Sequence, residues 1–269
     1  MNKHNILVGA DPEIFVKKNG AFISAHGLIQ GDKKKPQPVP KGAVQVDGMA
    51  LEFNIAPAAD EQEFVGNVEH VMGILASMVP DYELHAVPVA DFSLDYIAAQ
   101  PAAARELGCD PDFNAYTCDK NNPPNNTLPM RTASGHVHIG WGQGFSADDQ
   151  AHRERSEAVA RQMDYFLGLP ALFVDKDERR RLMYGKAGCL RYKPYGMEYR
   201  TLSNFWLNSK ELMAWVYQQT VSGVSQLFDG KDYTNEFGDV QGVIDNNDRA
   251  AAKAIIQRTG IILPAGVTM

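Results

Sequence analysis

Two periodicities of hydrophobic and polar residues along the chain predict a mixture of strands and helices. Apolar and polar residues alternate in GADPEIFV, GMALEFNIA, SGHVHIG and GMEYRTL, as expected of strands with one buried face. Apolar residues recur at helical spacing from Phe64 to Leu75, behind Asp60 as a predicted N-cap. Three more helices are expected, near residues 146–167, 209–228 and 247–259.

The remaining segments favour an antiparallel arrangement. Asn19 and Gly20 tolerate positive φ and predict a tight hairpin between about residues 5 and 25. Further strands are expected in ELHAVPVADF and CLRYKPYGMEYRTL. Prolines oppose regular pairing in GDKKKPQPVPKG, residues 31–42, which predicts a mobile loop, and residues 109–129 predict a long irregular one. We therefore expect an α+β fold in one domain, residues 1–269, with helices covering one face of a largely antiparallel sheet.

Residues that carry chemistry share one face of each alternating strand. These positions are Asp11 and Glu13, Glu52 and Asn54, His136 and His138, and Glu198 and Arg200. A sheet with one solvated face would explain any single strand. Carboxylates and imidazoles gathered on one face would repel or lie idle unless a cation joined them, so the four strands together predict a divalent metal site. Imidazole suits zinc and manganese, whereas carboxylates suit magnesium and calcium.

Basic residues near the last of these strands indicate which chemistry the metal serves. Arg191, Lys193 and Arg200 lie in or beside the strand that carries Glu198, and cations facing carboxylates and a metal suggest phosphate groups bridged by Mg²⁺. The run Arg179–Arg181 is typical of a solvated helix end instead.

Composition narrows the function classes. The chain has 269 residues, 44% of them hydrophobic, which is enough for a sizeable core. A net charge of −7 argues against non-specific nucleic-acid binding, so we expect no nucleic-acid partner. No apolar run long enough for a membrane span and no signal peptide is recognisable, so we expect a cytoplasmic protein. The spacing of the three cysteines, Cys109, Cys118 and Cys189, is that of neither a disulfide framework nor a zinc site. We expect them to be small buried residues or to pack in loops.

Five motifs in order resemble the superfamily of glutamine synthetase and glutamate–cysteine ligase, in particular its phage-associated branch of type 2 amidoligases. They are GADPEIF, VDGMALEFNIAP, GCDPDFNAYT, RTASGHVHIG and YGKAGCLRYKPYGMEYRTLSNFW, and they extend over roughly residues 5–210. The resemblance implies a glutamine synthetase-like sheet, with helices on one face and the active-site cleft on the other. It also implies a host-cytoplasm location if the chain is phage-encoded.

The resemblance further implies roles for individual residues. The metal ligands are expected to be Glu13, Glu52, His136 and Glu198. Arg200 and Glu198 are expected to act in catalysis, with Arg200 stabilising the transferred charge. Residues expected to contact the ATP are Arg191, Lys193, His138 and Lys186, and those near substrate are Asp47, Asn54 and Arg131.

On this basis the sequence predicts an ATP- and Mg²⁺- (or Mn²⁺-) dependent carboxylate–amine ligase that acts through an acyl phosphate, on small-molecule or peptide substrates. Three alternatives stay open. A guanidino kinase-like phosphotransferase would need similar phosphate-holding groups. A non-catalytic peptide- or nucleotide-binding protein would keep the ligand contacts without turnover. A zinc hydrolase would use His136 and His138, which lack the helical HExxH arrangement.

Overall fold

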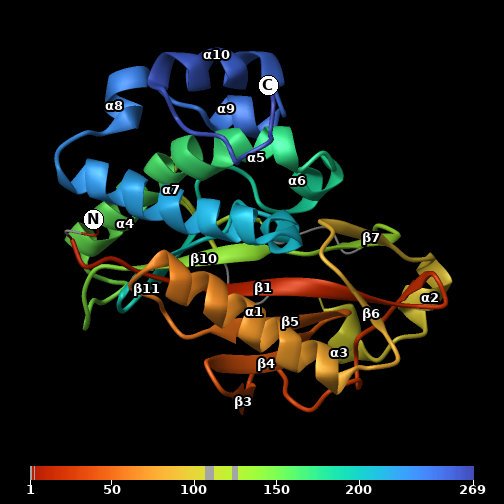
Figure 1. Ribbon diagram of the computed structural model, residues 1–269. Coiled ribbons are helices and arrows are strands. Elements are labelled where there is room, and N and C mark those ends of the chain that lie inside the picture. Colours follow the sequence, from red (N-terminus) through yellow and green to blue (C-terminus); the bar gives the residue numbers. More distant parts are fainter. Residues whose placement is uncertain (1, 3, 107–111, 123–126) are drawn as a thin grey trace.

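The computed structural model describes residues 2, 4–106, 112–122 and 127–269, and within them a ten-stranded antiparallel sheet forms the centre of the fold (Figure 1). Its strand order is β3-β4-β5-β1-β10-β12-β11-β8, with β2 and β6 paired to the far end of β1. The strands are β1 Leu7–Lys18, β2 Ala21–Ile23, β3 Gln37–Val39, β4 Gly42–Asp47, β5 Ala50–Ile55, β6 Glu83–His85, β8 Phe113–Asn114, β10 Gly135–Gly140, β11 Cys189–Lys193 and β12 Gly196–Tyr199. Two more, β7 Val89–Asp91 and β9 Met130–Thr132, pair separately.

Tight turns connect the neighbouring strands. Asn19 and Gly20 both have positive φ, 52° and 80°, which confirms the predicted hairpin between β1 and β2. Gly48, with φ of 58°, turns the chain between β4 and β5. The sequence pattern in QVDGMALEFNIAP suggests one strand, but this segment contains the end of β4, a turn and β5, because the glycine breaks the extended backbone.

The four helices that the sequence predicts are present as α1, α4, α7 and α10, and the described part of the chain has six shorter ones that were not predicted. The helices are α1 Glu61–Met78, α2 Leu94–Ala98, α3 Ala102–Arg105, α4 Gln150–Met163, α5 Leu169–Val174, α6 Arg179–Met183, α7 Lys210–Phe228, α8 Tyr233–Phe237, α9 Gln241–Asp245 and α10 Arg249–Thr259. A π-helical turn, Asp164–Gly168, joins α4 to α5, and a 3₁₀ helix spans Asn204–Asn208. The Asp60 side chain caps α1 as expected. Helix α4 starts later than predicted, because Asp149 rather than Ser146 provides its cap.

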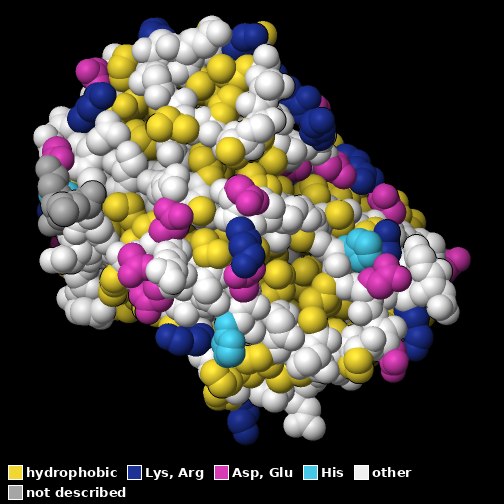
Figure 2. Space-filling model, in the orientation of Figure 1, with side chains coloured by type: hydrophobic (Ala, Val, Ile, Leu, Met, Phe, Trp, Pro, Cys, Tyr) yellow, Lys and Arg dark blue, Asp and Glu magenta, His cyan; other side chains and the backbone are white. Residues whose placement is uncertain are grey.

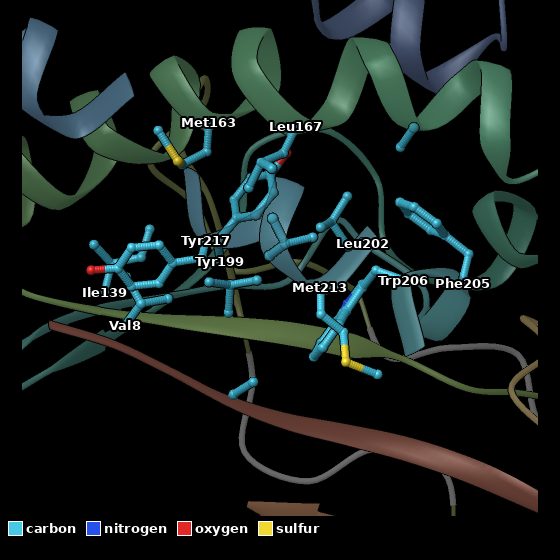
Figure 3. Packing of buried hydrophobic residues seen from close by; sticks show 14 of the residues in the cluster. Val8, Ile139, Met163, Leu167, Tyr199, Leu202, Phe205, Trp206, Met213 and Tyr217 are labelled. Carbon is cyan, nitrogen blue, oxygen red and sulfur yellow. The ribbon is translucent and has the colours of Figure 1, made fainter. Parts of the chain in front are cut away.

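The long helices cover one face of the sheet. In Figure 1, α1 and α7 pass across the strands, and the short C-terminal helices α8, α9 and α10 form an outer layer beyond α5. Figure 3 shows Val8 and Ile139 of the sheet beneath Met163 and Leu167 of the helical layer, all buried in one hydrophobic core. This core takes the apolar members of the alternating strands, so the polar members point to the other face, which agrees with the expected α+β arrangement.

A second, smaller core lies at one end of the polar face. Phe15 of β1, Met49 and Ala50 pack there with Phe92 and Ile97. Phe15 follows Asp11 and Glu13 on the same face of β1, so an aromatic side chain replaces the acids where the strand leaves the cleft. The small core thereby forms an apolar wall beside the polar side chains.

Two loop predictions need correction. The proline-rich segment 31–42 contains β3, which pairs with β4, because Gln37 and Val39 leave enough backbone groups to pair at an edge of the sheet. The segment 109–129 contains β8, which pairs with β11. Its residues 123–126 and Cys109 lie outside the described residues, while Cys118 and Cys189 are free thiols.

The prediction for the run of three arginines was right for one residue and wrong for two. Arg179 is solvated and pairs with Asp91 and Asp177. Arg180 and Arg181 are buried, because Arg180 bonds the Thr201 carbonyl just after β12 and Arg181 bonds Asn247 between α9 and α10.

The face that carries α1 has charges of both signs. Figure 2 shows Lys, Arg, Asp and Glu side chains interspersed with hydrophobic ones over the described part of this face. None of the helices in the described ranges is long and apolar enough to cross a membrane.

Candidate active site

The register of the sheet brings the polar faces of separate strands together. Asp11 of β1 lies opposite His136 of β10, and Glu13 lies opposite Glu52 of β5. One strand further, His138 lies opposite Glu198 of β12. The acids and imidazoles that alternation predicted on one face therefore form a continuous polar strip across the middle of the sheet.

Three carboxylates form the first group in this strip. Oxygens of Glu13, Asp47 and Glu52 lie within 4.8 Å of one another. Burial, with Asp47 as the next cause, raises the pKa of Glu13 to about 8, although the Ser134 amide donates a 2.7 Å hydrogen bond to it. Burial and the neighbouring acids, Asp11 first, also raise the pKa of Glu52 well above its usual range. Three acids this close are unfavourable without a cation.

Asp11, His136 and Glu198 form the second group. The Nδ1 atom of His136 lies 3.2 Å from one Asp11 oxygen and 3.4 Å from Glu198, and Nε2 of His138 lies 3.2 Å from the other Asp11 oxygen. Burial and then the nearby Arg200 lower the pKa of His136 to about 3, so its imidazole is neutral and able to act as a ligand.

Glu198 is the most buried acid of the site, with 0% exposure, and cations surround it. Arg200, directly after the end of β12, donates a hydrogen bond to it. Lys193 Nζ lies 2.8 Å from its Oε2 and Arg191 lies 3.6 Å away, both on β11. Arg200 in turn contacts Asp112 at 3.4 Å and the hydroxyl of Tyr184. This network fixes Arg200 at the base of the cleft.

Two cavities meet along the strip. The first, about 490 Å³, contains the carboxylate group and His136 and extends to Arg131, Arg200 and the small apolar core. The second, about 680 Å³, is lined by Leu7, Ile55, Pro57 and by the rings of Trp141 and Tyr195. Asp11, Gln45 and Glu52 line both cavities, so the acids stand where a charged end and an apolar end of one cleft meet.

Arg180 supports the floor of the cleft. Its guanidinium donates to the carbonyls of Thr201 and Leu202 at 2.7 and 2.9 Å and to the Ser134 hydroxyl at 3.0 Å. Ser134 is the residue whose amide binds Glu13. One buried arginine therefore ties the end of β12 to the start of β10.

Most residues expected in the site lie in this cleft. The first cavity is lined by Glu13, Asp47, Glu52, Arg131, His136, Arg191 and Arg200, and the second by Asn54 and His138. Glu198 and Lys193 contact each other beneath the strip. Lys186 is the exception: it lines neither cavity, and its charge lies near Asp245 of α9, because the turn at Gly185 carries the side chain towards the helical layer.

Several residues of the site were given no individual role from the sequence. Asp11 was placed on the polar face with Glu13 but not among the expected ligands, and it bridges both histidines. Arg180 of α6 and Tyr184, directly after α6, reach the site, and Lys33 reaches Asp47 at 2.6 Å from the proline-rich segment. Nothing in local spacing distinguishes these three from surface residues.

The residues fit divalent cations. An all-carboxylate group suits Mg²⁺ or Mn²⁺, and a mixed imidazole and carboxylate group suits Mn²⁺ as well as Mg²⁺. The Nε2 atom of His136 is buried without a hydrogen-bond partner among the described residues, as expected of a nitrogen reserved for a ligand. The raised pKa of Glu13 has the same implication, because a cation would relieve the repulsion among the three acids.

Comparison with known protein families covers the part of the chain that carries the second half of the site. Residues 133–223 match the family described as phage phiEco32-like COOH.NH2 ligase-type 2. The matched segment contains His136, His138, Glu198 and Arg200. The match confirms the resemblance to the phage-associated amidoligase branch. A search of curated proteins found no match.

Proposed function

We propose that this chain is an ATP-dependent ligase that joins a carboxylate to an amine through an acyl phosphate. The observation that carries the proposal is the convergence of two candidate cation-binding groups with Arg200, Arg191 and Lys193 in a cleft of the sheet, whose strands β10, β11 and β12 lie in the family-matched segment. Cation-binding acids beside basic side chains are the components that phosphoryl transfer requires. The family name supplies the carboxylate–amine specificity, whereas ATP and Mg²⁺ (or Mn²⁺) rest on this geometry.

The shape of the cleft suggests which cavity would bind each of the two substrates. The apolar cavity, with Trp141 and Tyr195, suits the base and ribose of ATP. The charged cavity, with Arg131 and Arg200, suits a carboxylate. The shared acids stand between them, where the terminal phosphate and the reacting carboxylate would meet. Bound divalent cations would neutralise phosphate oxygens there.

The reaction has two steps. An oxygen of the carboxylate attacks the terminal phosphorus of ATP, the bond to the bridging oxygen breaks, and ADP leaves with the electron pair. Arg200 and Arg191 stabilise the charge on the transferred group. The amine nitrogen then attacks the acyl carbon, the bond from that carbon to the phosphate oxygen breaks, and phosphate leaves while the nitrogen loses a proton.

We propose that residues 1–269 act as one amidoligase domain. The larger hydrophobic core, which includes residues from Ile6 to Ile261, supports this assignment. The substrates are proposed to be small molecules or peptides, since the charged cavity measures about 490 Å³.

Hydroxylamine offers a test that needs no knowledge of the natural amine. The protein is incubated with ATP, Mg²⁺, hydroxylamine and a panel of carboxylic acids, and hydroxamate, ADP and free phosphate are measured. A ligase yields all three in equal amounts. A guanidino kinase-like enzyme yields ADP and a phosphorylated product without free phosphate or hydroxamate, and that result would replace the proposal. Glu198→Gln serves as the inactive control.

A further inference from the structure

A buried carboxylate behind the cleft has no role in the chemistry proposed above. Asp164 opens the π-helical turn Asp164–Gly168, on the helical side of the sheet, and has 0% exposure. Short π-helical turns within α-helices are rare and frequently occur near functional sites. Asp164 lies behind β12, so its hydrogen-bond partners show which parts of the site it contacts.

Asp164 accepts hydrogen bonds from two tyrosines that belong to different parts of the site. The hydroxyl of Tyr199 donates to Oδ1 at 2.6 Å, and that of Tyr116 donates to Oδ2 at 2.9 Å. Tyr199 is the last residue of β12, between Glu198 and Arg200 in the chain, with its ring on the opposite face of the sheet. The Asp164 carboxylate therefore holds the end of the strand from the helical side, at the residue between the two proposed catalytic side chains.

Tyr116 links Asp164 to Arg200 through a different part of the chain. Tyr116 lies shortly after Asp112 in the chain, and the Asp112 carboxylate lies 3.4 Å from Arg200. Tyr116 packs over Gly188, where a Cβ would meet its ring at 2.7 Å. Asp164 thus holds both the strand that carries Arg200 and the segment that supplies its acidic partner.

The π-helical turn is shaped for this contact. A Cβ on Gly168 would lie 3.0 Å from the Tyr199 hydroxyl and 3.3 Å from Asp164 Oδ1. A side chain at this position would press on both partners of the hydrogen bond. Burial raises the pKa of Asp164 to about 7, while the hydrogen bonds from Tyr199 and Tyr116 act in the opposite direction. The two hydroxyls therefore favour the ionised, accepting form.

We propose that Asp164 is a positioning residue of the active site: through Tyr199 and Tyr116 it fixes Glu198 and Arg200 from the far side of the sheet. The inference rests on the proposed function only for the catalytic role of Glu198 and Arg200. The contacts between Asp164 and the two tyrosines do not depend on it. A residue that only stabilised the helical layer would contribute to folding without affecting what happens on the other face.

Matched hydroxyl deletions separate the two roles. Tyr199→Phe removes the contact with Asp164, and Tyr165→Phe removes a hydrogen bond of 2.5 Å from the same π-helical turn to the Gly238 carbonyl, away from β12. Each protein is titrated with Mn²⁺ alone and measured per folded molecule. We expect Tyr199→Phe to weaken Mn²⁺ binding about tenfold, as removal of supporting contacts commonly does, and Tyr165→Phe to leave it within about twofold. Tyr116→Phe, at a half-buried position, provides the comparison if Tyr199→Phe fails to fold.

A crystal structure of Tyr199→Phe gives a second readout that requires neither activity nor metal. Displaced Glu198 and Arg200 side chains relative to the unaltered protein are the expected result. Unchanged positions, with Mn²⁺ affinity equal to that of Tyr165→Phe, would overturn the positioning role even if the ligase activity were demonstrated. Displacement in a protein without hydroxamate-forming activity would instead support the positioning role and count against the proposed function alone.

Discussion

At the scale of single residues, the site depends on charges that are buried but balanced. Glu198 is fully buried and contacts Arg200, Lys193 and His136. Taking such a group out of water is costly, and only its partners compensate. The residues that would do the chemistry therefore also contribute to folding, which a solvated polar face would not require.

Replacing Glu198 with Gln is expected to reduce turnover per folded molecule at least 100-fold, because the amide neither binds a cation strongly nor balances Arg200. It should also lower the free energy of unfolding by about 3–5 kcal/mol, because Arg200 and Lys193 lose their buried partner. ATP-dependent phosphate release and urea unfolding measure the two effects. Near-native turnover in the folded fraction would contradict the assignment, and Arg200→Lys, which keeps the charge, serves as comparison.

Replacing Glu13 with Gln should stabilise the metal-free protein while removing a ligand. An acid whose pKa rises from 4.5 to about 8 on folding destabilises the folded state above its unfolded pKa, and the penalty disappears at lower pH. The variant is therefore expected to gain about 2–3 kcal/mol at pH 7 and nothing below about pH 4.5. Thermal unfolding at both pH values, with and without Mn²⁺, measures this.

The exposed Glu83 offers a control, since Glu83→Gln lies away from the cleft, beside His85. It should change neither the metal-free stability nor the stabilisation by Mn²⁺. A Glu13→Gln variant that resembles Glu83→Gln in both respects would show that the three acids do not act as a cation site.

At the scale of elements, the central strands hold the site residues in register, whereas the proline-rich segment with β3 lies at the edge of the sheet. β1 and β10 hold Asp11 and His136 in register at the centre of the sheet. The proline-rich segment lies at the edge, pairs only briefly through β3, and extends Lys33 to Asp47. Because its strand is short, we expect residues 31–42 to open locally at a low free-energy cost. Their position beside the charged cavity suits a segment that covers the cleft.

Hydrogen exchange in residues 31–42 is expected to slow several-fold when Mn²⁺ and ATP are added, because ligands at the three acids would order the segment that carries Lys33. Exchange in α10, which packs far from the cleft in the outer helical layer, provides the internal reference (Figure 1). Equal exchange in residues 31–42 with and without ligands would make them an ordinary surface loop.

At the scale of the whole molecule, the cleft has two chemically different ends that share one acidic centre. The aromatic cavity opens beside the end of β10, and the charged cavity beside its start. If the proposed function holds, this arrangement would keep the nucleotide and the carboxylate in separate cavities that meet at the acids. The helical layer leaves this face clear, since it packs on the other side of the sheet.

Tryptophan fluorescence should report the nucleotide end. Trp141 lines the aromatic cavity, whereas Trp206 and Trp215 are buried in the core, 0% and 3% exposed. A non-hydrolysable ATP analogue with Mg²⁺ is expected to change the emission by tens of per cent through contact with the indole. Trp141→Phe should abolish the change. A response that survives this substitution would place the nucleotide elsewhere.

The sequence by itself determined the local structure and the sorting of faces. Alternation in β1, β5, β10 and β12 and helical spacing in α1 and α7 are written in neighbouring residues, because backbone geometry imposes periods of two and 3.6. Local capping likewise placed Asp60 at the start of α1. The identity of Glu13, Glu52 and His136 as cleft residues follows from the same pattern.

Only the tertiary structure decided which of these side chains meet. Glu13 and the Ser134 amide that binds it are 121 residues apart, and strand register, not spacing, opposes Asp11 to His136. The division of the acids into two groups, the burial of Arg180 and the turn that carries Lys186 away depend on such long-range pairing. If the pairing of two strands shifted by one residue, the side chains of the shifted strand would point to the opposite face of the sheet. The site therefore exists only once the whole sheet has formed.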